Sequence, residues 1–287
     1  MKRLYFFIGT SAEFIKLSPV IKELKKRGVG FRIITSGQND INFDDLGKYT
    51  GEIVSDIEFP KKISKSSIFG FFLWSMQTFF LTFFLLGKEI SKAKDDELLL
   101  IIHGDTISSL IGALVAKLRG VKVVQIESGL RSFNILEPIP EEICRLIITR
   151  CTDTHFAPNG WALKNLKKAR GTKINTYENT LIEVCSWAIG KKTNSEYIKG
   201  LKNYYVLFIH RQEHIYFNQK WTLDIIQTIM KKAPSNLNCV LVMHTLTSRI
   251  LTSTKIDELS QINNRLIILP KLPYLDFVNL MKNAKFI

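Results

Sequence analysis

Short apolar runs alternate along the first part of the chain with longer segments in which apolar residues recur at helical spacing. The short runs predict buried strands at residues 4–8, 31–35, 98–103, 122–126 and 154–157. The intervening segments predict helices at about 13–26, after Ile41, and at 66–87, 108–119 and 141–151. This alternation is typical of a parallel sheet with right-handed crossover connections, so the sequence predicts an α/β fold.

The same alternation restarts after a polar, lysine-rich segment at residues 191–203. Predicted strands lie at 205–209, 239–243 and 266–269, and predicted helices at 218–232, 254–261 and 274–283. Because 287 residues exceed the usual size of a single core, we predict two Rossmann-like domains, 1–190 and 191–287. The apolar residues Phe286 and Ile287 are predicted to begin a further strand, so the second domain is expected to be incomplete.

Residues 66–87 form a charge-free segment that is rich in phenylalanine and flanked by Lys65 and Lys88. Its length and composition meet the criterion for a membrane-spanning helix. A single span would place neighbouring strands in different compartments, so we prefer a crossover helix within the fold whose outer face is too apolar for water. We expect a homodimer partner, or a membrane surface in contact with residues 68–86, to cover that face. A thin polar stripe on one side of the helix comprises Ser75, Thr78 and Thr82.

The formal net charge of +14 favours anionic partners. Nucleic acid is not expected among them, because the lysines are spread over several segments without zinc-finger spacing or the aromatic and glycine pattern of an RNA-binding sheet. No metal site is expected either, and the well-separated cysteines fit reduced thiols in a cytoplasmic protein. The apolar run at residues 4–8 is too short for a signal peptide. The four cysteines are Cys144, Cys151, Cys185 and Cys239.

Acidic residues follow two neighbouring strands of the predicted first domain. Asp105 comes after the third predicted strand and Glu127 directly after the fourth. Because ligands bind outside the carboxyl ends of parallel strands, we expect the two carboxylates to share one crevice. A third acid, Glu141 or Glu142, follows two prolines at the start of a predicted helix and could reach the same place.

Several of these residues also have a purely structural interpretation. Asp105 could cap the helix that follows it. Glu142 and Arg145 lie three residues apart on a predicted helix and could form only a surface ion pair. A histidine in an apolar strand, such as His103, is more often a core residue with satisfied hydrogen bonds than a ligand. In the second domain the two histidines that end strands facing the predicted crevice are His210 and His244.

A series of segments carries a resemblance to a known family. These segments are residues 9–19, 100–106, 125–131, 137–142, 179–182 and 210–213, together with His244. In that order and at that spacing, the chain resembles the non-hydrolysing UDP-N-acetylglucosamine 2-epimerases over nearly its whole length. The resemblance implies a GT-B fold, in which two Rossmann-like domains face each other. In that family a glycine-rich loop that grips uridine diphosphate comes next, so we expect a chain that lacks half of its nucleotide pocket.

The resemblance implies epimerisation at C2 of a UDP-N-acetylhexosamine, from UDP-GlcNAc to UDP-ManNAc, for the synthesis of cell-surface polysaccharide. The family expels UDP from C1 and loses the C2 proton to leave a glycal, and then adds UDP and a proton back. No cofactor is implied, and the turn after the first strand lacks the G-x-G-x-x-G of nicotinamide-dependent epimerases. The implied catalytic residues are Asp105, Glu127, Glu141 and His210. The implied substrate-binding residues are Ser11, Lys16, Arg131, His244 and Phe277, although the alternative that Arg131 pairs with Glu127 stays open.

Three positions depart from the family pattern. Ser11 stands where arginine is usual, Glu178 replaces a glycine before Asn-Thr, and Leu272 replaces a polar residue. These changes indicate an altered UDP-sugar preference or weakened binding. The alternatives are a GT-B glycosyltransferase, a hydrolysing 2-epimerase and an inactive truncated relative, and the three acids gathered in the first domain favour the epimerase.

Overall fold

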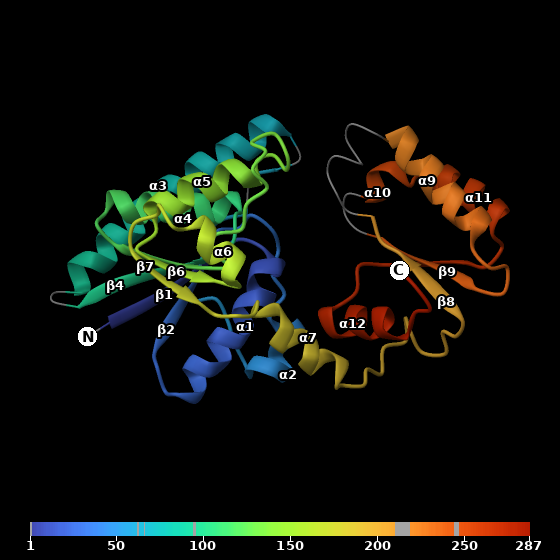
Figure 1. The fold of residues 1–287 in the computed structure, drawn as a ribbon, viewed down its shortest axis with the longest axis horizontal. Coiled ribbons are helices and arrows are strands. Elements are labelled where there is room, and N and C mark those ends of the chain that lie inside the picture. Colours follow the sequence, from blue (N-terminus) through green and yellow to red (C-terminus); the bar gives the residue numbers. More distant parts are fainter. Residues whose placement is uncertain (1, 62, 66, 94–95, 210–218, 244–246) are drawn as a thin grey trace. The chain divides into compact units, whose positions relative to one another are not determined.

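The computed structural model describes residues 2–287 with the exception of 62, 66, 94–95, 210–218 and 244–246 (Figure 1). The chain divides into two compact units, Met1–Val184 and Cys185–Ile287, and each has its own parallel sheet. The domain boundary predicted between residues 190 and 191 lies within the second of these units.

The first unit is built on a parallel sheet of seven strands in the order β3-β2-β1-β4-β5-β6-β7. The strands are β1 (Lys2–Ile8), β2 (Phe31–Thr35), β3 (Ile57–Glu58), β4 (Glu97–His103), β5 (Lys122–Ile126), β6 (Thr154–Ala157) and β7 (Thr172–Asn175). The strand order reverses at β1, which pairs with β2 on one side and with β4 on the other. This reversal creates the topological switch point beside which doubly wound sheets bind their ligands.

Helices connect these strands, and side-chain caps fix where several of them begin. Thr10 and Glu13 form a reciprocal capping box at the start of α1, and the Thr106 hydroxyl accepts from Ser109 N at the start of α4. The helical segments are α1 (Ser11–Lys26), η1 (Phe43–Leu46), α2 (Gly47–Thr50), α3 (Ile68–Ala93), α4 (Ile107–Leu118), α5 (Glu141–Cys151), α6 (Gly160–Asn165) and α7 (Leu181–Ile189). On one side of the sheet α3 packs against α4, and α4 packs against α5 (Figure 1).

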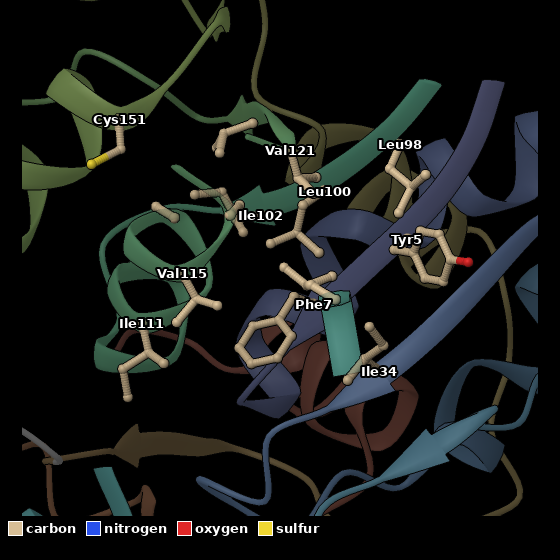
Figure 2. Close-up of a cluster of buried hydrophobic side chains, with 14 of the residues drawn as sticks. Tyr5, Phe7, Ile34, Leu98, Leu100, Ile102, Ile111, Val115, Val121 and Cys151 are labelled. Atoms are coloured by element: carbon tan, nitrogen blue, oxygen red, sulfur yellow. The ribbon is translucent and has the colours of Figure 1, made fainter. Parts of the chain in front are cut away.

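The central strands are buried on both faces, as expected for a parallel sheet with helices on each side. Phe7 of β1 and Leu100 and Ile102 of β4 are fully buried, and Figure 2 shows them in one interior with Val115 of α4. Burying one such side chain contributes about 1.5–3 kcal/mol, so this layer accounts for a large part of the stability of the unit. The strands that end at the candidate site are therefore held by a rigid core.

Helix α3 belongs to this core, as predicted, although it is long and apolar enough to cross a membrane. It packs on α4 and β4, and its buried Trp74 donates from Nε1 to the Ser36 carbonyl at 3.1 Å. The predicted polar stripe faces inward at Thr78 and Thr82, which are both buried. The helix also buries Trp74 and Leu86, while Phe72, Phe80 and Phe84 stay exposed on its outer side.

The second unit contains a smaller parallel sheet in the order β10-β9-β8. Its strands are β8 (Tyr204–Leu207), β9 (Asn238–Val242) and β10 (Leu266–Leu269), and its described helices after α7 are α9 (Gln219–Lys232), α10 (Thr247–Ile250), α11 (Ser253–Ile262) and α12 (Tyr274–Asn283). The last residues run beside β8, where Lys285 N donates to the Tyr204 carbonyl at 2.8 Å and Val206 N donates to the Phe286 carbonyl at 3.1 Å. The chain end thus makes strand-like hydrogen bonds, in line with the sequence-based interpretation.

Candidate active site

A candidate site lies at the carboxyl ends of β1, β4 and β5, close to the reversal of strand order. The residues after these strands include Glu13, Asp105 and Glu127. Asp105 and Glu127 both line one small depression in the surface, as the sequence predicted for a shared crevice. Its remaining lining residues are Gly104, Gln125, Gly129, Leu130, Arg145 and Thr149.

Glu13 is a buried carboxylate that ties the turn after β1 to the turn after β4. One oxygen accepts from Gly9 N at 2.7 Å and Thr10 N at 2.8 Å, and the other from the hydroxyls of Thr106 at 2.7 Å and Ser109 at 2.8 Å. Burial raises the pKa of Glu13 above its ordinary value, against the opposing effect of these four hydrogen bonds. Glu13 therefore acts as a structural centre between two loops of the site.

Gly9 is required at this turn because there is no space for a side chain. A Cβ atom at that position would lie 2.1 Å from Ser108 Oγ and 2.4 Å from Ser108 Cβ. The close approach lets the first turn of α4 pack directly against the end of β1. Substitution of Gly9 would therefore push the two turns apart.

Glu127 follows β5 and is held from two sides by polar groups. Lys16 Nζ, on α1, lies 2.8 Å from both carboxylate oxygens, and the Asn179 side-chain amide donates to Oε2. Burial opposes ionisation, but His103, Lys16 and Asn179 together outweigh it and keep the pKa of Glu127 below its ordinary value. The side chain is 10% exposed, so an ionised carboxylate is available at the surface of the depression.

The backbone of Glu127 adopts a left-handed conformation, with φ of 62°. This conformation is uncommon for a residue with a side chain and costs of order 1–3 kcal/mol. Such strain persists where surrounding contacts impose it, and it is concentrated at functional sites. Here the contacts of Lys16 and Asn179 with the carboxylate supply the constraint.

A buried polar network supports the loops that carry the two acids. The Gln125 side-chain amide donates to the Gly104 carbonyl at 2.8 Å, which joins the end of β5 to the turn after β4. Ser128 Oγ donates to Gln125 Oε1 at 2.8 Å and lies 2.9 Å from His155 Nδ1. All of these side chains are buried, so the network ties the two loops to the interior of the unit.

Asp105 lies at the turn after β4 and pairs with Arg145 of α5. The carboxylate oxygen Oδ2 is 2.7 Å from Arg145 Nε and 2.6 Å from Nη2, a charge-assisted contact that fixes the acid. The interpretation of Asp105 as a helix cap is wrong, because the hydroxyl of Thr106 caps α4. Asp105 is therefore not needed to cap α4.

Glu142, rather than Glu141, is the buried acid at the start of α5. Its oxygens accept from Arg131 Nε at 2.5 Å, Ser132 N at 3.0 Å and Arg145 Nη1 at 3.3 Å. The expected pairing with Arg145 is present, but the expectation that it lies on the surface is wrong, since Glu142 is fully buried. The sequence left two roles open for Arg131, substrate binding and pairing with Glu127. Its pairing with Glu142 was not anticipated. Glu141 is the half-buried first residue of the helix, and its catalytic role stays a prediction.

His103 is the last residue of β4 and faces Glu127. Its Nε2 lies 3.6 Å from Glu127 Oε2 and has no hydrogen-bond partner within the described part of the chain. His103 is buried in the core, as expected, but its Nε2 lacks, among the described residues, the hydrogen bond that was also expected. Burial lowers the pKa of His103 to about 4, so the imidazole is neutral at physiological pH.

The remaining predicted binding residues are distributed over both units. Lys16 contacts Glu127, and Ser11 Oγ donates to the Asp40 carbonyl at 3.1 Å. In the second unit Phe277 packs on Phe208, with ring centroids 5.0 Å apart. His210 and His244 lie outside the described residues. Binding of substrate by any of these side chains stays a prediction.

Comparison with known proteins identifies the family of this chain. A family model described as UDP-N-acetylglucosamine 2-epimerase matches residues 81–287. The chain belongs to the UDP-N-acetylglucosamine 2-epimerase family. The UDP-N-acetylglucosamine 2-epimerase of Methanocaldococcus jannaschii is 27% identical over 317 aligned residues, covering 99% of this chain and 77% of the relative. That of Methanococcus maripaludis is 28% identical and covers 100% of this chain and 77% of the relative.

Solved structures of 2-epimerases confirm the fold of this family member. The M. jannaschii enzyme in complex with UDP-GlcNAc and UDP has a TM-score of 0.79 at 24% identity, covering 99% of this chain and 77% of that chain. The Neisseria meningitidis enzyme bound to UDP-GlcNAc has a TM-score of 0.78 at 23% identity, and the match covers 99% of this chain and 76% of that chain. The predicted α/β fold of the GT-B type is thereby confirmed.

Sequence reasoning missed two residues that organise the site of this family member. Arg145 was considered only as a surface partner of Glu142, yet it also fixes Asp105. Glu13 appeared only within a matching segment, although Thr10 and Glu13 have the spacing of a capping box, which could have indicated a buried carboxylate at the end of β1.

Proposed function

We propose that the chain epimerises UDP-GlcNAc at C2 to UDP-ManNAc by eliminating UDP and adding it back, in the service of cell-surface polysaccharide synthesis. Membership of the family and the activity named for its relatives support an epimerase. The observation that carries the proposal is the position of Asp105 and Glu127 in one depression at the carboxyl ends of β4 and β5. The UDP-GlcNAc and UDP bound to structural relatives support a UDP-sugar as the ligand.

The chemistry requires carboxylates near the sugar ring. No carbonyl acidifies the C2–H bond, so a base alone cannot remove that proton from the intact substrate. Breakage of the C1–O bond first gives an oxocarbenium-like state, which acidifies C2 and which nearby carboxylates stabilise. A base then removes the C2 proton to leave a glycal, and proton delivery to the opposite face on re-addition of UDP inverts C2.

The contacts of the two acids favour different tasks for them in this scheme. Lys16 and Asn179 favour the ionised form of Glu127, which suits a group that accepts a proton or stabilises positive charge. Asp105 is held by Arg145 at a fixed position on the adjacent strand end. The two acids are thereby held at neighbouring strand ends and line the same depression. We propose Glu141 and His210 as further participants, as the family resemblance implies.

Isotope exchange at C2 tests the proposal directly. Incubation of the protein with UDP-GlcNAc in heavy water should place deuterium at C2 of both the gluco and the manno sugar. Glu127→Gln and Asp105→Asn should each slow the exchange by roughly 10²- to 10⁴-fold, the usual contribution of a positioned acid or base. Glu23→Gln is the matched control, because Glu23 is an exposed residue of α1 whose ion pairs within the described residues are with Lys26 and with Arg27, the cap that follows the helix.

Each competing function predicts a different product. A GT-B glycosyltransferase would give no exchange at C2, and a hydrolysing enzyme would release free N-acetylmannosamine. Exchange that continues undiminished in both variants would remove Asp105 and Glu127 from the catalytic role. Circular dichroism of the variants establishes that a loss of exchange reflects chemistry rather than unfolding.

A further inference from the structure

One edge of the seven-stranded sheet carries a series of basic residues with no acid among them. The edge strand is β7, and α6 precedes it in the chain (Figure 1). Residues 154–177 contain both elements and include no aspartate or glutamate. The basic residues of this segment are named the basic cluster, and they are Lys164, Lys167, Lys168, Arg170 and Lys173.

The basic cluster is open to an outside partner. All of its members are exposed except Lys173, which is half-buried. None of them forms an ion pair with another described residue, and the flanking acid Asp153 lies 3.6 Å from Lys117 Nζ instead. Protection of a sheet edge would explain Lys173 alone, because the other members lie on α6 or between α6 and β7. Unpaired charges of one sign attract an anionic partner.

The backbone that carries the cluster is held by contacts with the rest of the first unit. The Asn165 side-chain amide donates to the Gly129 carbonyl at 2.9 Å, which ties the end of α6 to the loop after β5. His155 Nε2, on β6, lies 3.0 Å from the Arg170 carbonyl. Lys173 stands opposite His155 in the parallel pairing of β6 and β7. Because the segment is already ordered, a partner would have to immobilise only the side chains of the cluster.

Two large aromatic side chains accompany the cluster. Trp161 lies three residues before Lys164 on α6, so the two side chains share one side of the helix. The Trp161 ring is 48% exposed and meets the Phe133 ring edge to face, with centroids 6.2 Å apart. The Phe133 ring is 66% exposed and has the Arg131 guanidinium 5.1 Å from its centroid. The surface therefore combines positive charge with exposed aromatic area.

We propose that the basic cluster and Trp161 dock the first unit on a bilayer that contains anionic lipids. The basic side chains would contact the headgroups, and the indole of Trp161 would lie at the boundary with the acyl chains, where tryptophan is enriched. Clusters of roughly four to eight lysines and arginines are typical of binding to acidic lipids. Nucleic acid fits less well, because Arg131 and Trp161 already engage the Phe133 ring and restrict its stacking on bases.

Vesicle sedimentation with the full chain tests this docking. The protein should bind vesicles of phosphatidylglycerol and phosphatidylcholine, bind pure phosphatidylcholine at least about tenfold more weakly, and lose affinity as salt is added. Replacing all members of the basic cluster by glutamine should lower the affinity for the mixed vesicles at least about 100-fold. Lys167→Gln with Lys168→Gln, a milder change, should cost about 25-fold, and Trp161→Ser should cost about tenfold.

A matched control removes the same number of charges from exposed lysines of the second unit, and it should bind vesicles like the wild type. Its substitutions are Lys191→Gln, Lys192→Gln, Lys202→Gln, Lys231→Gln and Lys232→Gln. Circular dichroism establishes that the variants are folded. Equal binding to neutral and anionic vesicles, or equal binding by the cluster variant and its control, would overturn the proposal. So would a wild-type protein that ignores vesicles but binds single-stranded DNA or polyglutamate through the cluster, because the partner would then be a soluble polyanion.

Discussion

Acidification should destabilise the first unit through His103. Burial of this imidazole lowers its pKa from the ordinary value of 6.5 to about 4, because the charged form would lose its hydration. As the pH falls through 6.5, the unfolded chain takes up a proton that the folded chain does not bind until about pH 4. The contribution of His103 to stability is therefore complete above pH 6.5 and is lost progressively between pH 6.5 and pH 4.

The size of the effect follows from the shift in pKa. One pKa unit corresponds to about 1.4 kcal/mol, and pH 4.5 lies about two units below the pKa of the unfolded state, so the loss at that pH is roughly 2.5 kcal/mol. Other groups titrate in the same range. Because the pKa of Glu127 is lowered in the folded state, its protonation also makes the folded protein less stable at acid pH. The raised pKa of Glu13 has the opposite effect. Comparison with His103→Gln measures the contribution of the histidine together with its electrostatic interaction with Glu127.

Urea unfolding of wild type and His103→Gln at pH 7.5 and pH 4.5 provides the assay. The wild type should lose about 2.5 kcal/mol more than the variant between the two pH values. His155→Gln is a useful comparison, because the bond between its ring and the Arg170 carbonyl partly offsets burial and the loss should be smaller. Equal pH dependence of wild type and His103→Gln would refute the reasoning, as would an NMR titration of His103 centred near pH 6.5.

Three further perturbations test other contacts of the site. Gly9→Ala should destabilise the protein by about 1–3 kcal/mol in thermal unfolding, and Ser108→Gly in the same chain should recover most of that loss by removing the clash. Glu142→Gln leaves two arginines without their carboxylate and should cost about 2–4 kcal/mol in urea unfolding, whereas a change below 0.5 kcal/mol would contradict a buried network. Lys16→Met should raise the pKa of Glu127. The acid side of the profile of C2 exchange rate against pH should then move to higher pH. An unchanged profile would show that Lys16 does not control the ionisation of Glu127.

The fold was predictable from the sequence where the apolar pattern was strong. The central strands of the first unit carry continuous apolar runs, and their positions and parallel arrangement follow from the alternation with helices. The edge strands β3 (Ile57–Glu58) and β7 (Thr172–Asn175) were not predicted. β3 has only two residues, and β7 has no fully buried residue, so neither has a recognisable period.

The candidate site was predictable only in part, because its pairings depend on tertiary contacts. The shared position of Asp105 and Glu127 followed from the rule for strand ends, and the structure bears it out. The partner of Arg131 could not be derived from spacing, since the loop between Arg131 and Glu142 decides which acid it meets. Likewise, nothing in an apolar strand reveals that His103 faces a carboxylate.

The hydrogen bonds of the Glu13 carboxylate join two loops of the first unit. The same carboxylate holds the backbone at Gly9 and Thr10 and the side chains of Thr106 and Ser109. One oxygen of the carboxylate serves the turn after β1 and the other serves the turn after β4. Both turns therefore depend on the position of a single side chain, and loss of the Glu13 carboxylate would remove hydrogen bonds from both at once.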